Sequence, residues 1–117
     1  MNRLDRLALW RDLSAECANL VRDHEASLTV DADSASARLD IRFAALRGLV
    51  NGLSVGKCPV ATAWEAAADF LPLARLFVAD DTTPAVKLQL GPKVILAAER
   101  LAAELEKGER QRADVYG

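Results

Sequence analysis

The sequence has few of the residues that catalytic, metal and disulfide sites require. It holds one histidine and two cysteines in 117 residues. Cys17 and Cys58 lie far apart, and neither belongs to a CxxC motif, so neither a zinc ribbon nor a disulfide framework is indicated. The phosphate-binding patterns GxxxxGK[ST] and GxGxxG are absent, as is the nucleophile motif GxSxG. We therefore predict no catalytic residue, no metal ligand and no cofactor site, and expect a protein that is not an enzyme.

Other absences concern the membrane and nucleic acids. No apolar run approaches the ~18 residues of a membrane span. The N-terminal residues carry a charge every few positions, unlike the apolar core of a signal peptide. These features predict a cytoplasmic protein outside the membrane. The net charge of −2 argues against a mainly electrostatic nucleic-acid binder.

The residues that are present favour helices. Hydrophobic residues make up 51% of the chain, and most of them are Ala and Leu, which are the best helix formers. Aromatic residues amount to only 5%, which argues against a sheet-dominated fold. The length suits one domain. We predict an all-α fold, a small irregular bundle of four to five helices over residues 1–108, followed by a polar tail at 109–117.

Two amphipathic helices are predicted in the first half of the chain. The first runs from about Asn2 or Arg3 to Glu25, because apolar residues recur there at helical spacing. The second runs from about Ser34 or Ser36 to Leu53. An alternative for residues 28–43 is a β-hairpin, because apolar and polar residues alternate on both sides of the DSAS sequence. The helix is preferred because its apolar face continues to Leu53.

The segment 60–79 is the most apolar and is predicted to form the central helix, with Pro59 suited to its first position and a break or kink near Pro72. Thr83 is expected to cap the next element, with Pro84 in its first turn. Residues 85–90 fit a short helical turn or a strand that ends at Gly91 and Pro92. The last helix is predicted at 93–107, with Gly108 as its C-terminal cap.

One enzymatic alternative rests on Cys58, which precedes the central helix. A helix N-terminus and Lys57 would lower the pKa of this thiol, and His24 is the only imidazole available as a base. A small thiol enzyme is thus an alternative function. The competing interpretation is a packed cysteine and a histidine near a helix end. Cys17 lies seven residues from His24, about 10.5 Å along a helix, too far for both to bind one metal ion.

A second alternative is a DNA-binding transcriptional regulator that uses residues 38–70 as two helices joined by a turn. Basic residues lie near this region: Arg38, Arg42, Arg47 and Lys57. The arginines point to different sides of their helix. Glu65 and Asp69 are the exposed residues of the would-be recognition helix, and carboxylates repel the phosphate backbone.

The preferred function is a protein–protein interaction module, such as an adaptor, a regulator or a small inhibitor of a larger assembly. Its basis is apolar residues that the predicted helix faces leave outside the core, because several of them on a small domain indicate a surface for another chain. The partner is another protein or a second copy in a homodimer, and the composition suggests a bacterial or bacteriophage origin. The predicted partner-binding residues are Leu4, Leu7, Ile41, Leu96, Val115 and Tyr116.

Overall fold

The computed structural model describes the backbone of residues 2–28 and 33–116 and the side chains of residues 2–28 and 37–111. The elements in chain order are α1 (Arg3–Ser27), α2 (Asp33–Asn51), the 3-10 helices η1 (Val55–Lys57) and η2 (Ala61–Ala63), α3 (Trp64–Val78) and α4 (Pro84–Tyr116). The described residues contain no strand. The all-α prediction is confirmed. The hairpin alternative at 28–43 is wrong, since the described part from residue 33 onward is helical.

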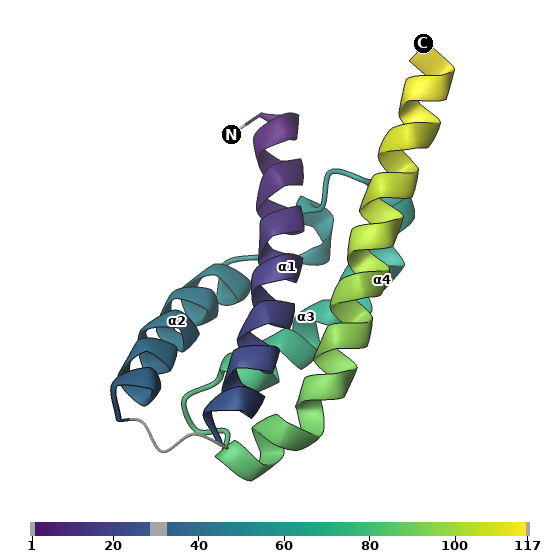
Figure 1. The fold of residues 1–117 in the computed structure, drawn as a ribbon. Helices are drawn as coiled ribbons and strands as arrows, with labels where there is room; N and C mark the ends of the chain where they lie inside the picture. The colour runs from purple at the N-terminus through teal and green to yellow at the C-terminus, as the bar shows by residue number, and fades with distance from the viewer. Residues whose placement is uncertain (1, 29–32, 117) are drawn as a thin grey trace.

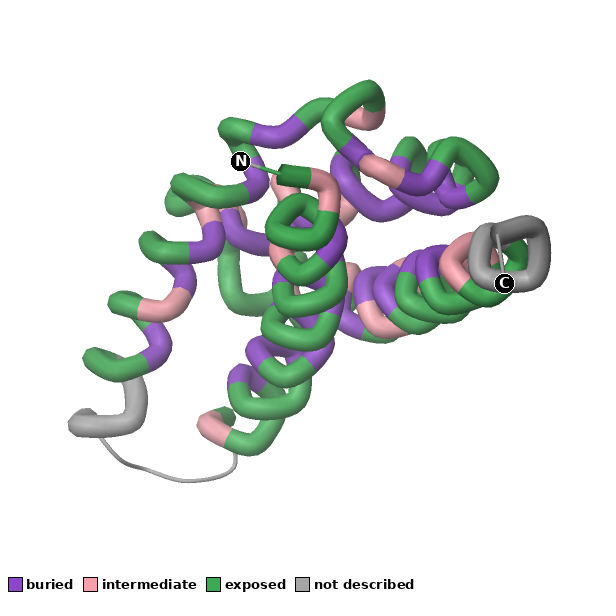
Figure 2. The backbone as a smooth tube through the Cα atoms, turned by 90° about the horizontal axis from the view of Figure 1, so that it is seen from above, coloured by how far each residue is buried: buried purple, intermediate pink, exposed green. Residues whose placement is uncertain are grey.

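The helices form an elongated bundle of 52 × 25 × 20 Å. α1 lies between α2 and α4, and α3 packs behind it against both (Figure 1). Seen from above, α2 forms one edge of the bundle, with its buried residues turned toward α1 (Figure 2). The largest fully buried side chains include Trp10, Phe70 and Phe77. Burying one such side chain stabilises the fold by ~1.5–3 kcal/mol. The buried residues form a single core to which all four helices contribute.

The buried face of α1 is wider than its sequence pattern indicates, and the prediction that Leu7 lies outside the core is wrong. Leu7 is only 4% exposed. It lies on the same side of the helix as Ser14 and Ala18, seven and eleven residues later. Those two residues face Ala98 of α4 across a shallow depression. Because α1 packs against α2 on one side and α4 on the other, a residue at the edge of its apolar stripe is also buried.

Neither proline inside a helix ends that helix. The predicted stop at Pro92 is wrong, and of the break or kink predicted near Pro72, the break does not occur. α3 continues through Pro72, and α4 continues through Pro92, so residues 84–116 form one helix rather than a short segment followed by a helix at 93–107. A proline leaves the carbonyl four residues earlier without its helical donor. Those carbonyls belong to Ala68 and Leu88, which are exposed, as are both prolines. Water can therefore satisfy the carbonyls.

Two glycines of α4 are explained by close packing rather than by turns. No glycine among the described residues has a positive φ, and the prediction that Gly108 ends the helix is wrong. A Cβ at Gly91 would lie 2.9 Å from Cγ1 of Val21, and one at Gly108 would lie 2.2 Å from Cγ1 of Val60. The missing side chains let α4 approach α1 and the segment before α3. The ion pair of Arg3 with Glu109 then joins the start of α1 to α4.

These contacts predict opposite effects for the same substitution at two helical glycines. Gly108→Ala should lower the free energy of unfolding by about 1–3 kcal/mol, because the new methyl overlaps Val60. Gly48→Ala should raise it by about 0.5–1 kcal/mol, because alanine has the higher helix propensity and nothing lies within 4 Å of the new Cβ. Urea unfolding at low protein concentration measures both changes. Equal effects at the two positions would contradict the packing role of Gly108.

Candidate functional site

Two indole groups hold the segment that carries Cys58. Nε1 of Trp10 donates a hydrogen bond to the carbonyl of Lys57 at 3.3 Å, and Nε1 of Trp64 donates one to the carbonyl of Cys58 at 2.9 Å. Nζ of Lys57 donates to the carbonyl of Gly52. The polar groups of this loop are thus used to fix its backbone.

The geometry does not suit the thiol chemistry considered for Cys58. Its side chain is buried, and burial raises the pKa of the thiol. The Sγ–H faces the carbonyl of Val60 at 3.6 Å. His24 lies near the other end of α1, fourteen residues after Trp10, or about 21 Å of helix. The thiol and the imidazole are therefore not within hydrogen-bond reach.

Cys17 and metal ligands give no further candidate. Cys17 is fully buried, and burial raises its pKa to about 12. Among the described residues there is no group of three or more His, Cys, Asp or Glu side chains placed to hold a metal ion.

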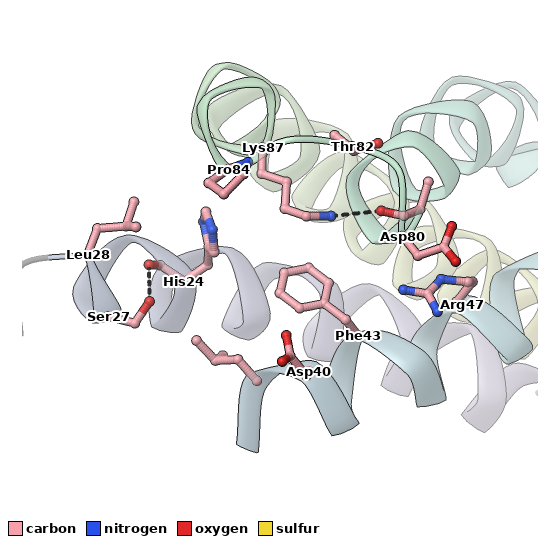
Figure 3. A pocket seen from close by; sticks show the side chains of 12 residues that line it. His24, Ser27, Leu28, Asp40, Phe43, Arg47, Asp80, Thr82, Pro84 and Lys87 are labelled. Atoms are coloured by element: carbon pink, nitrogen blue, oxygen red, sulfur yellow. Dashed lines mark hydrogen bonds between the residues drawn. The ribbon is translucent and has the colours of Figure 1, made fainter. Parts of the chain in front are cut away.

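A cavity of about 490 Å³ opens at the end of the bundle where α1, α2 and the start of α4 meet. Its wall contains a cluster of charged and polar side chains. His24, Phe43 and Lys87 line its floor, and Asp40, Arg47 and Asp80 lie around it (Figure 3). The His24 ring meets the rings of Phe43 and Phe77 edge-on, with centroids 5.9 and 6.1 Å away. Cavities with convergent charged groups are the usual place to look for a ligand site.

The cations of this cavity are already used to cap a helix. The last carbonyls of an α-helix have no intrahelical donor. At the end of α3, Nζ of Lys87 donates to the carbonyls of Phe77 and Ala79, and Nε of Arg47 donates to that of Val78 at 2.8 Å. The hydroxyl of Thr82 donates to the carbonyl of Leu76. Lys87 also lies over the Phe43 ring, 4.4 Å from its centroid. The arrangement is a C-terminal cap in which the ammonium already has three partners.

α2 ends with a matching cap from α3. Arg75 donates from Nε to the carbonyl of Val50 and from Nη2 to that of Leu53. Arg47 of α2 thus caps α3, and Arg75 of α3 caps α2. Positive side chains near helix C-termini also interact favourably with the helix dipole. The sequence offered a signal for this role, because each arginine lies about one turn before the end of its own helix. It did not indicate that each one serves the other helix.

The imidazole of His24 is held in its neutral form. Burial lowers its pKa, and the nearby Lys87 lowers it further, while Glu25 acts in the opposite direction. Burial also lowers the pKa of Lys87, and Arg47 adds to that effect. His24 therefore resists protonation because it lies inside the aromatic cluster and beside a cation.

The region considered for DNA binding has most of its charges paired within the protein. Arg42 pairs with Asp23 and Glu16 of α1. The two acidic residues at the exposed face of α3, Glu65 and Asp69, pair with Arg100 of α4. Of the basic residues near this region, Arg47 and Lys57 bind backbone carbonyls. Within residues 38–70, all of which the structure describes, the basic residues do not line up along one face.

Three of the predicted partner-binding residues are well exposed. Leu4 is 69%, Ile41 71% and Leu96 68% exposed, and they lie on three different helices. Leu7 belongs to the core, and the side chains of Val115 and Tyr116 lie outside the described residues. Whether Leu4, Ile41 and Leu96 contact a partner stays a prediction.

Sequence reasoning missed a larger apolar surface around Ile41. The side of α2 that faces away from the bundle, continued by the residue after the helix, carries small and apolar residues at spacings of three and four. All of them are exposed: Ala37, Ile41, Ala44, Ala45, Gly48, Leu49 and Gly52. We name this set the α2 outer face. Arg38 lies at its border, and Asp40, Arg42 and Asn51 lie on its flanks. The sequence pattern identified the inward face of α2, but the small residues of the opposite face looked like ordinary exposed helix positions.

No known protein family, curated protein or solved structure matches the chain. None of the helices in the described part of the chain combines the length and the apolar character that crossing a bilayer requires.

Removing the ammonium group of Lys87 tests the helix cap. Lys87→Met should lower the free energy of unfolding by about 1–3 kcal/mol, because two part-buried carbonyls lose a charged donor. Lys93→Met, on the exposed side of the same helix, is the matched control and should change it by less than about 0.5 kcal/mol. Chemical denaturation at pH 7 measures both. Equal small losses would mean that Lys87 is not needed to cap α3.

The neutral His24 predicts a loss of stability in acid. Its pKa is lowered from the ordinary 6.5 in the folded chain, so the unfolded chain binds the proton first. The stabilisation is present above pH 6.5 and is lost as the pH falls below that value, by up to about 1.4 kcal/mol per pH unit. His24→Leu should remove this part of the slope. Denaturation curves between pH 7.5 and 5 test it, and identical slopes for both chains would contradict it.

Proposed function

We propose that the protein is a non-enzymatic protein-binding module, an adaptor, regulator or small inhibitor of a larger assembly, and that it binds through the α2 outer face. The observation that carries the proposal is that an exposed helix face has apolar residues where charged ones are usual. Ile41, at its centre, is the most exposed large apolar residue among the described side chains.

The energetics favour a covered state of this face. Fully burying an exposed side chain of the size of Ile41 is worth ~1.5–3 kcal/mol. Ile41 is 71% exposed in the single chain, and Leu49 is 45% exposed. Contiguous apolar patches on a small protein are typical of contact sites for other proteins. The surrounding charges of Asp40 and Arg42 would form the polar rim that such interfaces have.

The two alternative functions have less support. A DNA-binding regulator would need free basic side chains, and Arg42, Arg47 and Lys57 have partners within the chain. A thiol enzyme would need a base beside Cys58, and His24 lies along α1 at a distance from it. The cavity beside His24 could hold a small molecule by volume, but its cations are committed to the end of α3.

Site-specific photo-crosslinking in the cells of origin tests the proposal. A photoreactive amino acid in place of Ile41 should give a covalent adduct with a protein chain, because the partner covers this position. The same amino acid in place of Asp12, an exposed position on α1, is the control and should give no adduct above background. Adduct masses are read from denaturing gels and mass spectrometry. Absence of any adduct from position 41 would contradict the proposed function.

A further inference from the structure

The glycine at the centre of the α2 outer face has no explanation within the chain. A glycine in a helix interior costs ~1 kcal/mol relative to alanine, and the other described glycines inside helices, Gly91 and Gly108, are required by packing against Val21 and Val60. At Gly48, an added Cβ would meet nothing within 4 Å. The space left by the missing side chain therefore serves no contact inside this protein, and it lies on the same side of α2 as Ile41, two helical turns or about 10.5 Å away.

We infer that the α2 outer face is a homodimer interface, in which α2 packs antiparallel against α2 of a second copy about a twofold axis between Ala44 and Ala45. This inference rests on the proposed function and names its partner. In such a pair, residues at equal distances from the axis face each other. Ile41 then faces Gly48 of the second copy, and Ala44 faces Ala45. The large side chain of each copy enters the glycine hollow of the other.

The α2 outer face is complementary in shape to a second copy of itself only when the two α2 helices are antiparallel. A twofold interface uses the same patch on both copies, so every protrusion must match a recess of the same patch. A parallel pair would set Ile41 against Ile41 and leave the two Gly48 hollows facing each other. The antiparallel pair alternates large and small residues, which brings helix axes within the 8–10 Å of ordinary helix packing.

The charges around the face agree with the same arrangement. In an antiparallel twofold pair, the same flank of both helices lies on the same side of the interface, and the two chains run in opposite directions along it. Asp40 of one copy then lies about 3 Å in height from Arg47 of the second copy, two residues of rise, so opposite charges meet. Nε of Arg47 donates to Val78, so an ion pair with Asp40 of the second copy would use the terminal nitrogens of Arg47. On the other flank, Leu49 meets the aliphatic stem of Arg42.

The size of the face sets the strength of the dimer. α2 has 19 residues, about 28 Å of helix with a width of about 10 Å. The footprint is then about 280 Å² per copy, less than the roughly 800 Å² per partner of a standard stable interface. The dimer should be weak and concentration-dependent, and populated mainly where the chain is concentrated.

Sedimentation equilibrium of the purified chain from about 10 μM to about 1 mM tests the inference over the range where weak dimers dissociate. The chain should pass from monomer to dimer. Gly48→Gln should weaken this association at least ten-fold, because its side chain fills the hollow, while the melting temperature of the dilute monomer stays the same or rises. Ala103→Gln, at an exposed small residue of α4, is the matched control and should leave the association unchanged.

Oxidation of Ala45→Cys provides an independent readout. Two copies of this thiol would lie beside the twofold axis, so a disulfide-linked dimer should form readily, while the buried Cys17 and Cys58 do not compete. Ala8→Cys, exposed on α1, is the control and should stay monomeric.

A monomer at every concentration, or unchanged association of Gly48→Gln, would overturn the inference. If photo-crosslinking at Ile41 then captures a different protein, the proposed function stands without the homodimer. If it captures nothing, both proposals fail. An adduct with the mass of two copies supports both.

Discussion

The fold depends on the contact between the C-terminal turns of α2 and α3. Each helix presents a negative dipole end and several carbonyls without donors at this point. Left unpaired in the interior, each carbonyl would cost about 1–3 kcal/mol. Arg47, Arg75 and Lys87 provide the donors, and each comes from a different helix than the one it caps. Three helices are thereby joined through their backbones, which fixes their relative positions more strictly than apolar packing alone.

This arrangement also determines what the polar cavity can do. A cavity with a histidine, a lysine and an arginine would ordinarily be the first candidate for chemistry. Here the cations serve backbone carbonyls, and the imidazole is kept neutral by burial among Phe43 and Phe77. The pKa values of His24 and Lys87 are lowered because both side chains are partly buried where Lys87 caps the C-terminal end of α3. A bound substrate is not needed to explain them.

The sequence predicted the helices better than their ends. Apolar periodicity identified α1 and α2 because their core faces repeat without interruption, as with Leu39, Phe43 and Val50. The proline rule failed at Pro92 and the glycine rule at Gly108, and no break occurs at Pro72, because those rules describe an isolated helix. In the folded chain the prolines face water, and the glycine meets Val60. These outcomes depend on neighbours distant in the sequence, which local patterns do not contain.

The same limit explains why the sequence located one contact residue of the proposed surface and not the surface itself. Ile41 stood out because it left the predicted core face, while Ala44, Ala45 and Gly48 looked like ordinary helix residues. Only the fold shows that they point outward together, and only comparison with Gly91 and Gly108 shows that Gly48 lacks an internal reason to be small. A glycine kept in a helix against its propensity indicates close approach of another chain segment. For Gly91 and Gly108 that segment lies in the same chain. For Gly48 no described segment of the chain lies within 4 Å of an added Cβ, and this is the basis for proposing a second copy there.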